Sequence, residues 1–220
     1  MSKSKLMVAM LVVMLLTIAG VSYGKEDSQI WSDASLSFRM SDYWKFTFSE
    51  EFRFNDGDSI YHHSDVGIST DKLFENMDVG LNYRLYYHRK DGGQEWKQVH
   101  SPHLNFTFKS DLFDMPVSNR SRFQFLDNEE GQDYWKYRNK TTLKLDKWFT
   151  VYKFKPYVSN EIFINLRDDT QLNRNRASAG LTHKLSKNVD MKLFYLLQTS
   201  KKNKDWSSMD VFGFTFKFKF

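Results

Sequence analysis

The sequence predicts an all-β protein, a transmembrane antiparallel up-and-down β-barrel of ten to twelve strands. Three observations predict it. Apolar and polar side chains alternate with period two in about eleven segments, the pattern of strands with two different faces. Aromatic residues make up 17% of the chain, whereas only three residues are prolines. The chain also begins with an export-type segment and ends on the alternating aromatic run FGFTFKFKF.

Residues 1–24, MSKSKLMVAMLVVMLLTIAGVSYG, have the organisation of a secretory signal peptide. Lys3 and Lys5 precede an apolar run at 6–19, and the small residues Ser22 and Gly24 precede the expected cleavage point. The alternative is a membrane-spanning helix, but the run of about 14 residues is shorter than the roughly 20 that a helix needs. We therefore expect a signal peptide at 1–24 and a single barrel domain at 25–220.

The composition of residues 25–220 excludes several classes of protein. This part contains no cysteine, so disulfides do not stabilise it and no lipid-anchored cysteine follows the signal peptide. Without Lys3 and Lys5, 30 basic residues remain against 27 acidic ones, a net charge of about +3. That charge is too small to argue for nucleic-acid binding, and we expect no nucleic-acid partner.

The strands are placed by their alternation, which is clearest at 77–88, where Met77, Leu81 and Tyr83 share one face and Arg84 lies on the other. Each strand has about 9–12 residues, which suits a tilted strand crossing a bilayer. We expect strands at 29–40, 44–54, 60–69, 77–88, 103–109, 119–126, 135–145, 157–164, 176–185, 189–197 and 212–220. Tight turns are expected at 41–43 and 186–188, and longer hydrophilic segments at 55–59, 89–97, 127–134, 165–174 and 199–208.

Charge is sorted between the two faces of these strands. The apolar face carries almost no charge, with Glu50 as the clear exception, and the opposite face is rich in Lys and Arg. A soluble β-sandwich is the alternative for such alternation. Tyrosine and tryptophan near strand ends favour the membrane, because these side chains form girdles at bilayer interfaces. The expected girdle residues are Trp44, Tyr87, Trp135, Trp148 and Tyr157.

The last strand explains the terminal aromatic run. Its phenylalanines face lipid in this interpretation, and Lys217 and Lys219 face a wet lumen. Its ending resembles the assembly signal that the barrel-insertion machinery reads in outer-membrane proteins, with Phe216, Phe218 and Phe220 as the signal residues. We therefore expect export through the inner membrane to the outer membrane of a Gram-negative bacterium, with outer-membrane lipid and the insertion machinery as partners.

The number of strands conflicts with one rule. Bacterial barrels normally have an even number of strands, whereas eleven are counted here. Either residues 29–40 are partly a luminal segment or one strand is overlooked. Ten or twelve strands are therefore expected.

No strong catalytic or metal signature is present. His183 and Ser186 would point to opposite faces of an extended strand, as would the neighbours His62 and His63. His100 and His103 are separated in the same way, and NDGDS at 55–59 lacks the later glutamate of a calcium loop. We expect no enzymatic activity, no cofactor and no metal site.

The polar face is expected to line the lumen. Arg120 and Arg122 share a face on one strand, and Lys136, Arg138 and Lys140 share it on the next, which predicts a basic patch. An open lumen with such a patch would be a small channel for anionic or polar solutes. A narrow lumen would be filled by a salt-bridged plug, giving a closed structural or surface-binding barrel. Because basic residues outnumber acidic ones on this face, the channel is the preferred hypothesis. The expected lumen-lining residues are Glu51, Arg53, Arg84, Arg120, Arg122, Lys136, Arg138, Lys140, Glu161, Lys217 and Lys219.

Three segments resemble an uncharacterised family of outer-membrane β-barrels, a domain of unknown function. They are WSDASLSFRMSDYWKFTFSEEFRFNDG, VGLNYRLYY and KPYVSNEIFIN, and the resemblance covers nearly all of 25–220. The residues that carry it are Trp31, Trp44, Glu51, Arg53, Phe54, Gly80, Tyr83, Arg84, Pro156, Tyr157, Glu161 and Phe163. The resemblance implies a fold and a location but no activity. It supports a luminal network of Glu51, Arg53, Arg84 and Glu161.

Overall fold

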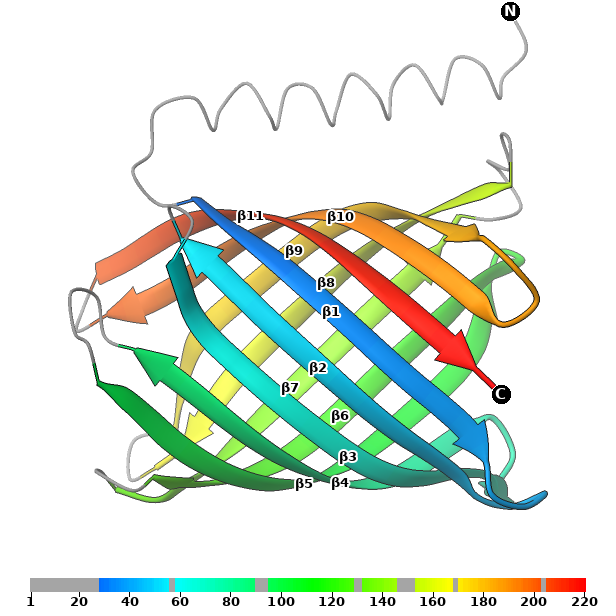
Figure 1. The fold of residues 1–220 in the computed structure, drawn as a ribbon, viewed down its shortest axis with the longest axis horizontal. Helices are drawn as coiled ribbons and strands as arrows, with labels where there is room; N and C mark the ends of the chain where they lie inside the picture. Colours follow the sequence, from blue (N-terminus) through cyan, green and yellow to red (C-terminus); the bar gives the residue numbers. More distant parts are fainter. Residues whose placement is uncertain are drawn as a thin grey trace, which may run out of the picture.

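A computed structural model describes residues 28–55, 58–89, 95–128, 132–145, 153–167, 170–202 and 205–220. Within these residues eleven strands form one closed β-barrel, which confirms the expected fold class (Figure 1). No helix in the same ranges is long and apolar enough to cross a membrane. The expected signal peptide at 1–24 and Trp148 lie outside the described residues.

The strands follow one another around the barrel in chain order. They are β1 (Ser28–Arg39), β2 (Lys45–Asn55), β3 (Asp58–Phe74), β4 (Met77–Arg89), β5 (Trp96–Leu112), β6 (Met115–Asn128), β7 (Tyr134–Lys144), β8 (Phe154–Leu166), β9 (Gln171–Lys184), β10 (Val189–Lys202) and β11 (Asp205–Lys219). Most were expected within a few residues. The strands β3, β5, β9, β10 and β11 extend well beyond the expected bounds, because pairing with their neighbours continues past the segments of clean alternation. Most of the loop expected at 199–208 is therefore strand.

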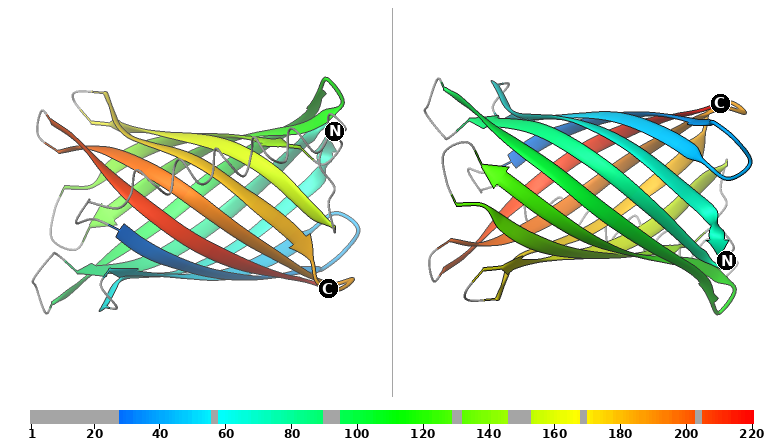
Figure 2. Two further views of the ribbon diagram at one scale, coloured as in Figure 1. Left: turned by 90° about the horizontal axis from the view of Figure 1, so that it is seen from above. Right: turned by 90° about the horizontal axis from the view of Figure 1, so that it is seen from below.

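Two of the tight turns contain residues in the left-handed backbone conformation. Asn76 joins β3 to β4 with φ 59°, and Phe113 and Asp114 join β5 to β6 with φ 49° and 62°. Two consecutive positive φ values are typical of the type I′ turn that matches the twist of paired strands. These turns lie at the same end of the barrel as those at 41–43 and 186–188 (Figure 2). We call this the turn end and the opposite end the loop end.

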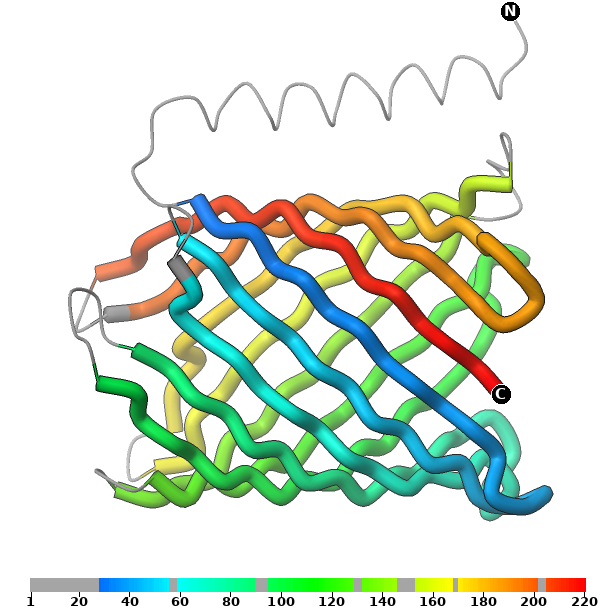
Figure 3. Tube along the Cα trace, viewed as in Figure 1, coloured from blue at the N-terminus to red at the C-terminus, as the bar shows by residue number. Residues whose placement is uncertain are grey.

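The barrel closes through a parallel pair. The strand β1 pairs antiparallel with β2 and parallel with β11, from Ser28 opposite Asp210 to Ser37 opposite Lys219. Eleven strands lie within the predicted range of ten to twelve, but the expectation of an even number is wrong, and residues 29–40 are not a luminal segment. An odd number of up-and-down strands brings the first and last strands together in the same direction, so only a parallel pair closes the sheet. The two neighbours run side by side in Figure 1 and Figure 3, with the start of β1 at the loop end and the C-terminus at the turn end.

Inward and outward side chains alternate along every strand, as the pleat of a sheet requires. Leu81, Phe212 and Phe220 lie on the outer wall with 56%, 47% and 69% of their surfaces exposed. Trp44 and Trp135 are also exposed there, as expected for girdle residues.

Tyr157 does not belong to the outer girdle, so that expectation is wrong. It shares its face with Glu161, four residues along β8, and is only 4% exposed inside the barrel. Its ring occupies the space left by Gly180 on β9, where a Cβ atom would lie 2.7 Å from the tyrosine ring. Phe194 covers Gly213 in the same way. Aromatic residues on this part of the wall therefore fill the interior.

The inward side chains differ between the two ends of the barrel. Near the turn end short residues alternate with charged ones such as Arg39, Lys45 and Lys109, and near the loop end several inward residues are large and apolar or aromatic. The short ones are Ser35, Ser37, Thr47, Ser49, Gly67, Ser69, Gly80, Thr107, Ser118 and Thr142. The large ones are Trp31, Tyr61, Tyr86, Val99, Leu126, Phe163, Leu196 and Val211. Short and charged side chains therefore line the turn-end half of the interior, whereas apolar and aromatic ones are concentrated near the loop end.

Candidate functional site in the barrel interior

Arginines stacked on aromatic rings occupy the loop-end half of the interior. The Arg53 guanidinium lies between the rings of Trp31 and Tyr61, 3.9 and 4.0 Å from their centroids. Arg176 lies 4.7 Å from the Trp31 ring and 4.8 Å from the Phe163 ring. Such stacking stabilises a cation that has left water.

Trp31 also anchors a small apolar cluster. It packs with Leu196 and Val211, and Phe194 and Met209 cover the edge of this cluster. The loop-end half of the interior is thus packed with aliphatic, aromatic and guanidinium groups.

A three-residue ion-pair cluster spans three adjacent strands near mid-height. The Glu161 carboxylate on β8 accepts hydrogen bonds from Arg138 on β7 at 2.9 Å and from Arg120 on β6 at 3.2 Å. Glu161 is 4% exposed, so the carboxylate depends on these two cations for its neutralisation. Lys140 lies directly opposite Glu161 in the strand register.

Two further carboxylates pair with arginines on the other side of the barrel. Arg84 donates to Asp65 through Nε at 2.9 Å, and Asn82 donates to the second oxygen of Asp65 at 3.1 Å. Arg53 donates to Glu51 through Nε at 2.6 Å, two residues away on the same strand. Each of these luminal carboxylates is therefore matched by an arginine.

Other buried arginines have neutral partners instead. Arg122, 5% exposed, donates from Nε to the Asn105 side-chain oxygen at 2.8 Å, and its Nη1 has no hydrogen-bond partner among the described residues. Arg176, 7% exposed, donates to the Gln198 side-chain oxygen at 2.8 Å. In the register, Arg122 stands directly opposite Arg138. The interior therefore holds more buried positive charge than its carboxylates neutralise.

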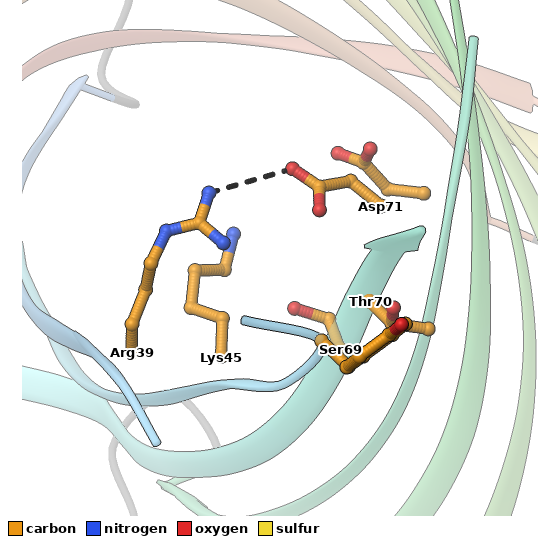
Figure 4. Close-up of a pocket in the computed structure, with 7 residues that line it drawn as sticks. Arg39, Lys45, Ser69, Thr70 and Asp71 are labelled. Carbon is orange, nitrogen blue, oxygen red and sulfur yellow. Dashed lines mark ion pairs between the residues drawn. The ribbon is translucent and has the colours of Figure 1, made fainter. Parts of the chain in front are cut away.

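The turn end of the interior carries a looser set of charges. Lys109 pairs with Asp78 at 2.6 Å, and Lys219 pairs with Asp190. Arg39 and Asp71 form an ion pair at 3.6 Å in a pocket of about 30 Å³, enough for about one water molecule (Figure 4). Lys45, Ser69 and Thr70 complete the labelled wall of that pocket. These pairs are more exposed than those near mid-height, so we expect each to contribute little to stability.

The structure brings most of the sequence-predicted lumen residues onto one continuous inner wall. Glu51 and Arg53 form one pair, and Glu161, Arg120 and Arg138 form one cluster. Lys136 lies 5.2 Å from the Tyr134 ring, and Lys217 is exposed at the turn end, beside Ser35 in the register.

The sequence did not single out several residues that line the interior. Asn82 and Asn105 connect the two halves of the polar network, with Asn105 donating to Asn82 at 2.6 Å. Asn82 shares its strand face with Arg84 on β4, and Asn105 shares its face with Lys109 on β5, which was the signal available in the sequence. Arg174 belongs to β9, although a loop was expected there, because a register shift between Phe163 and Ile164 adjusts the β8–β9 pairing.

Glu50, the acidic residue on the otherwise uncharged outer face of its strand, also has a hydrogen-bond partner. The Glu50 carboxylate lies 2.6 Å from Nε2 of His62 on β3, and the imidazole stacks on Phe52 with centroids 4.4 Å apart. His63, the next residue, points inward and is 2% exposed. His62 and His63 thus lie on opposite faces, as expected, and His183 stacks on Phe154 at 4.5 Å.

Comparison with known proteins places this chain in a family. No curated protein sequence matches it. Among solved structures, it is similar to the translocator domain of the autotransporter NalP from Neisseria meningitidis, with 8% sequence identity, 92% of each chain covered and a TM-score of 0.42. Residues 28–209 match the family model described as a protein of unknown function, DUF2490. This match covers nearly the whole barrel, and the chain therefore belongs to the DUF2490 family.

Proposed function

We propose that this protein is a narrow outer-membrane channel that prefers small anionic solutes. The observation that carries the proposal is the surplus of buried cations among the described interior residues, where the hydrogen bonds of Arg122 and Arg176 go to the neutral amides of Asn105 and Gln198. Unneutralised charge in a dry interior is costly. Water or a passing anion beside these guanidinium groups would remove that cost, and the turn end, which is lined by short and charged side chains, would be the entrance.

The outer-membrane location is part of the proposal. The outer wall presents Leu81, Phe108, Leu193 and Phe212 with 56%, 56%, 45% and 47% of their surfaces exposed, an apolar belt suited to lipid. A closed sheet also satisfies the backbone within a bilayer, because no edge is left unpaired. With the C-terminus towards the periplasm, the turn end would open to the periplasm. The proposal includes no catalytic step, no cofactor and no nucleic-acid partner.

A closed barrel without transport is the second candidate, and a specific observation favours it. The loop-end half of the interior is packed by the cluster of Trp31, Leu196 and Val211, and Glu161 is fully engaged by two arginines. In that case the arginine network would hold the wall together, and the loops would be the functional surface.

Reconstitution into planar bilayers separates the two candidates. For the channel we expect discrete conductance steps and a reversal potential that indicates anion preference in a potassium chloride gradient. Arg122→Gln should move the reversal potential towards zero, because it removes a luminal positive charge that has no carboxylate partner among the described residues. Lys187→Gln, in the exposed turn at 186–188, removes the same charge outside the interior and should leave it unchanged. The absence of conductance would favour the closed barrel, and cation preference would exclude an anion channel.

We also propose that the terminal phenylalanines are read during assembly. Phe220→Ser should reduce insertion into the outer membrane more than it reduces the stability of the folded barrel. The backbone of Phe220 donates a hydrogen bond to the Ser37 carbonyl at 2.9 Å and accepts one from the Arg39 N–H at 3.2 Å, whatever its side chain. An exposed side chain at the rim contributes only about 1–2 kcal/mol to the free energy of unfolding.

The measurement compares the amount of barrel in outer-membrane fractions with the free energy of unfolding of refolded protein in urea. Phe113→Ser, on an 80% exposed turn residue at the same end, is the matched control and should assemble normally. Normal assembly of Phe220→Ser would contradict the assignment.

A further inference from the structure

Apart from the Glu50–His62 pair, one sector of the outer wall carries a group of polar side chains. It comprises Asn119, Ser121, Asn139, Thr141, Asn160 and Asn175, on the strands β6 to β9, and we call it the amide stripe. Asn119 and Asn139 exchange two side-chain hydrogen bonds of 2.9 Å, and Asn119 also donates to Thr141 at 2.8 Å. Asn160 and Asn175 exchange two more, at 3.1 and 3.3 Å.

The stripe points away from the interior. Asn139 stands between Arg138 and Lys140, and Asn160 precedes Glu161. Arg138 and Glu161 belong to the luminal ion-pair cluster, and Lys140 lies opposite Glu161. Because adjacent residues of a strand face opposite sides, each asparagine must face outward when its neighbour faces inward. Thr141 is directly opposite Asn160 in the register, so the polar groups continue from β7 to β8 without interruption.

The depth of the stripe excludes lipid headgroups as its partners. Asn139 lies at the centre of β7 and Asn160 at the centre of β8, far from both barrel ends. The hydrocarbon core of a bilayer is about 30 Å thick, so the centre of a spanning strand faces acyl chains. On other strands this level carries residues such as Leu81 and Leu193.

The hydrogen bonds within the amide stripe do not use all the donors and acceptors of its side chains. A side-chain amide has two N–H donors and an oxygen with two lone pairs. Asn160 and Asn175 each donate one hydrogen bond to the other and accept one from it, so each keeps one further N–H donor and one further lone pair for another partner. In hydrocarbon such groups are costly unless another polar group meets them.

We propose that the amide stripe is the contact surface between two copies of this chain in the membrane. A two-fold interface requires a surface that complements itself. Amides meet that requirement because each both donates and accepts, whereas a stripe of one charge would repel its copy. Val158 and Ile162, on the same outward face of β8 as Asn160, would pack around the polar centre.

Cysteine cross-linking tests the proposal directly, because the chain has no native cysteine. Ala177, exposed and directly opposite Asn160 in the register, is the reporter position. In proteoliposomes, Ala177→Cys treated with a bifunctional maleimide should give a product with twice the mass of the chain. Leu81→Cys, exposed on the opposite wall, is the matched control and should remain monomeric. Adding Asn139→Leu and Asn160→Leu to Ala177→Cys should reduce the cross-linked dimer at least tenfold.

Several results would overturn the second copy as the partner. They are monomers only, equal cross-linking from both walls, or unchanged cross-linking after the double asparagine replacement. A cellular cross-link from Ala177→Cys to a different protein, without the dimer, would do so as well. Heat-modifiable migration on gels verifies that each variant is a folded barrel. Conductance is measured separately, so failure of the channel proposal is distinguishable from failure of this one.

Discussion

Glu161→Gln should lower the free energy of unfolding of the barrel by about 3–5 kcal/mol, because it removes the one carboxylate of a buried three-residue ion-pair cluster. The glutamine preserves the shape of the side chain but leaves Arg138 and Arg120 without their carboxylate. The remaining cations then repel each other, since Arg122 and Lys140 are their neighbours in the register. Urea unfolding in liposomes, followed by tryptophan fluorescence, measures the change.

Asp190→Asn is the matched control for that prediction. It removes a carboxylate from the pair with Lys219, whose side chain is 58% exposed at the turn end. Exposed pairs contribute at most about 1 kcal/mol, so this variant should unfold close to the wild type. Equal effects of the two replacements would contradict the view that the Glu161 cluster holds buried charge together.

Leu81→Arg should destabilise the barrel by roughly 2–4 kcal/mol if the outer wall faces lipid, because a cation near the bilayer midplane loses its hydration. Leu81 is 56% exposed and lies opposite Leu104 and Ile68 on the neighbouring strands, without an acidic residue opposite it in the register. The measurement is again urea unfolding, in liposomes of defined thickness.

Thr107→Arg is the control for the Leu81 replacement. Thr107 faces inward on β5, opposite Asp78 in the register, where a new cation meets water and a carboxylate. This variant should change stability by less than Leu81→Arg and should alter ion selectivity instead. Partition of the wild type into detergent and heat-modifiable migration are the companion measurements, because a soluble protein core would also reject Leu81→Arg. A reversed order of the two variants would exclude a lipid-facing outer wall.

The sequence by itself determined the strands and the face to which most side chains belong. Period-two alternation is a local property, and the pleat converts it directly into two faces. Arg84, Arg138 and Lys217 were therefore assigned to the inner wall, and Leu81 and Phe218 to the outer wall, without knowledge of any pairing. The tight turns at 41–43 and 186–188 were likewise evident, since a short polar interruption between two strands leaves little choice of connection.

Only the tertiary structure decided how the barrel closes and what fills it. Eleven alternating segments can be counted in the sequence, but the usual even number of strands in bacterial barrels argued against eleven, and the parallel β1–β11 pair that an odd number requires is evident only from the structure. Tyr157 was assigned to the wrong side because aromatic residues suit both an interface and a packed interior, and the gap at Gly180 on another strand makes the difference.

The ion-pair partners of the luminal charges also could not be predicted from the sequence. Glu161 meets Arg138 and Arg120 because register brings β6, β7 and β8 to the same level, and a one-residue slip would separate them. The amide stripe depends on the same register across β6 to β9. Alternation along one strand fixes the face of a residue, but its neighbours across the sheet are set by the register between paired strands, which alternation does not encode.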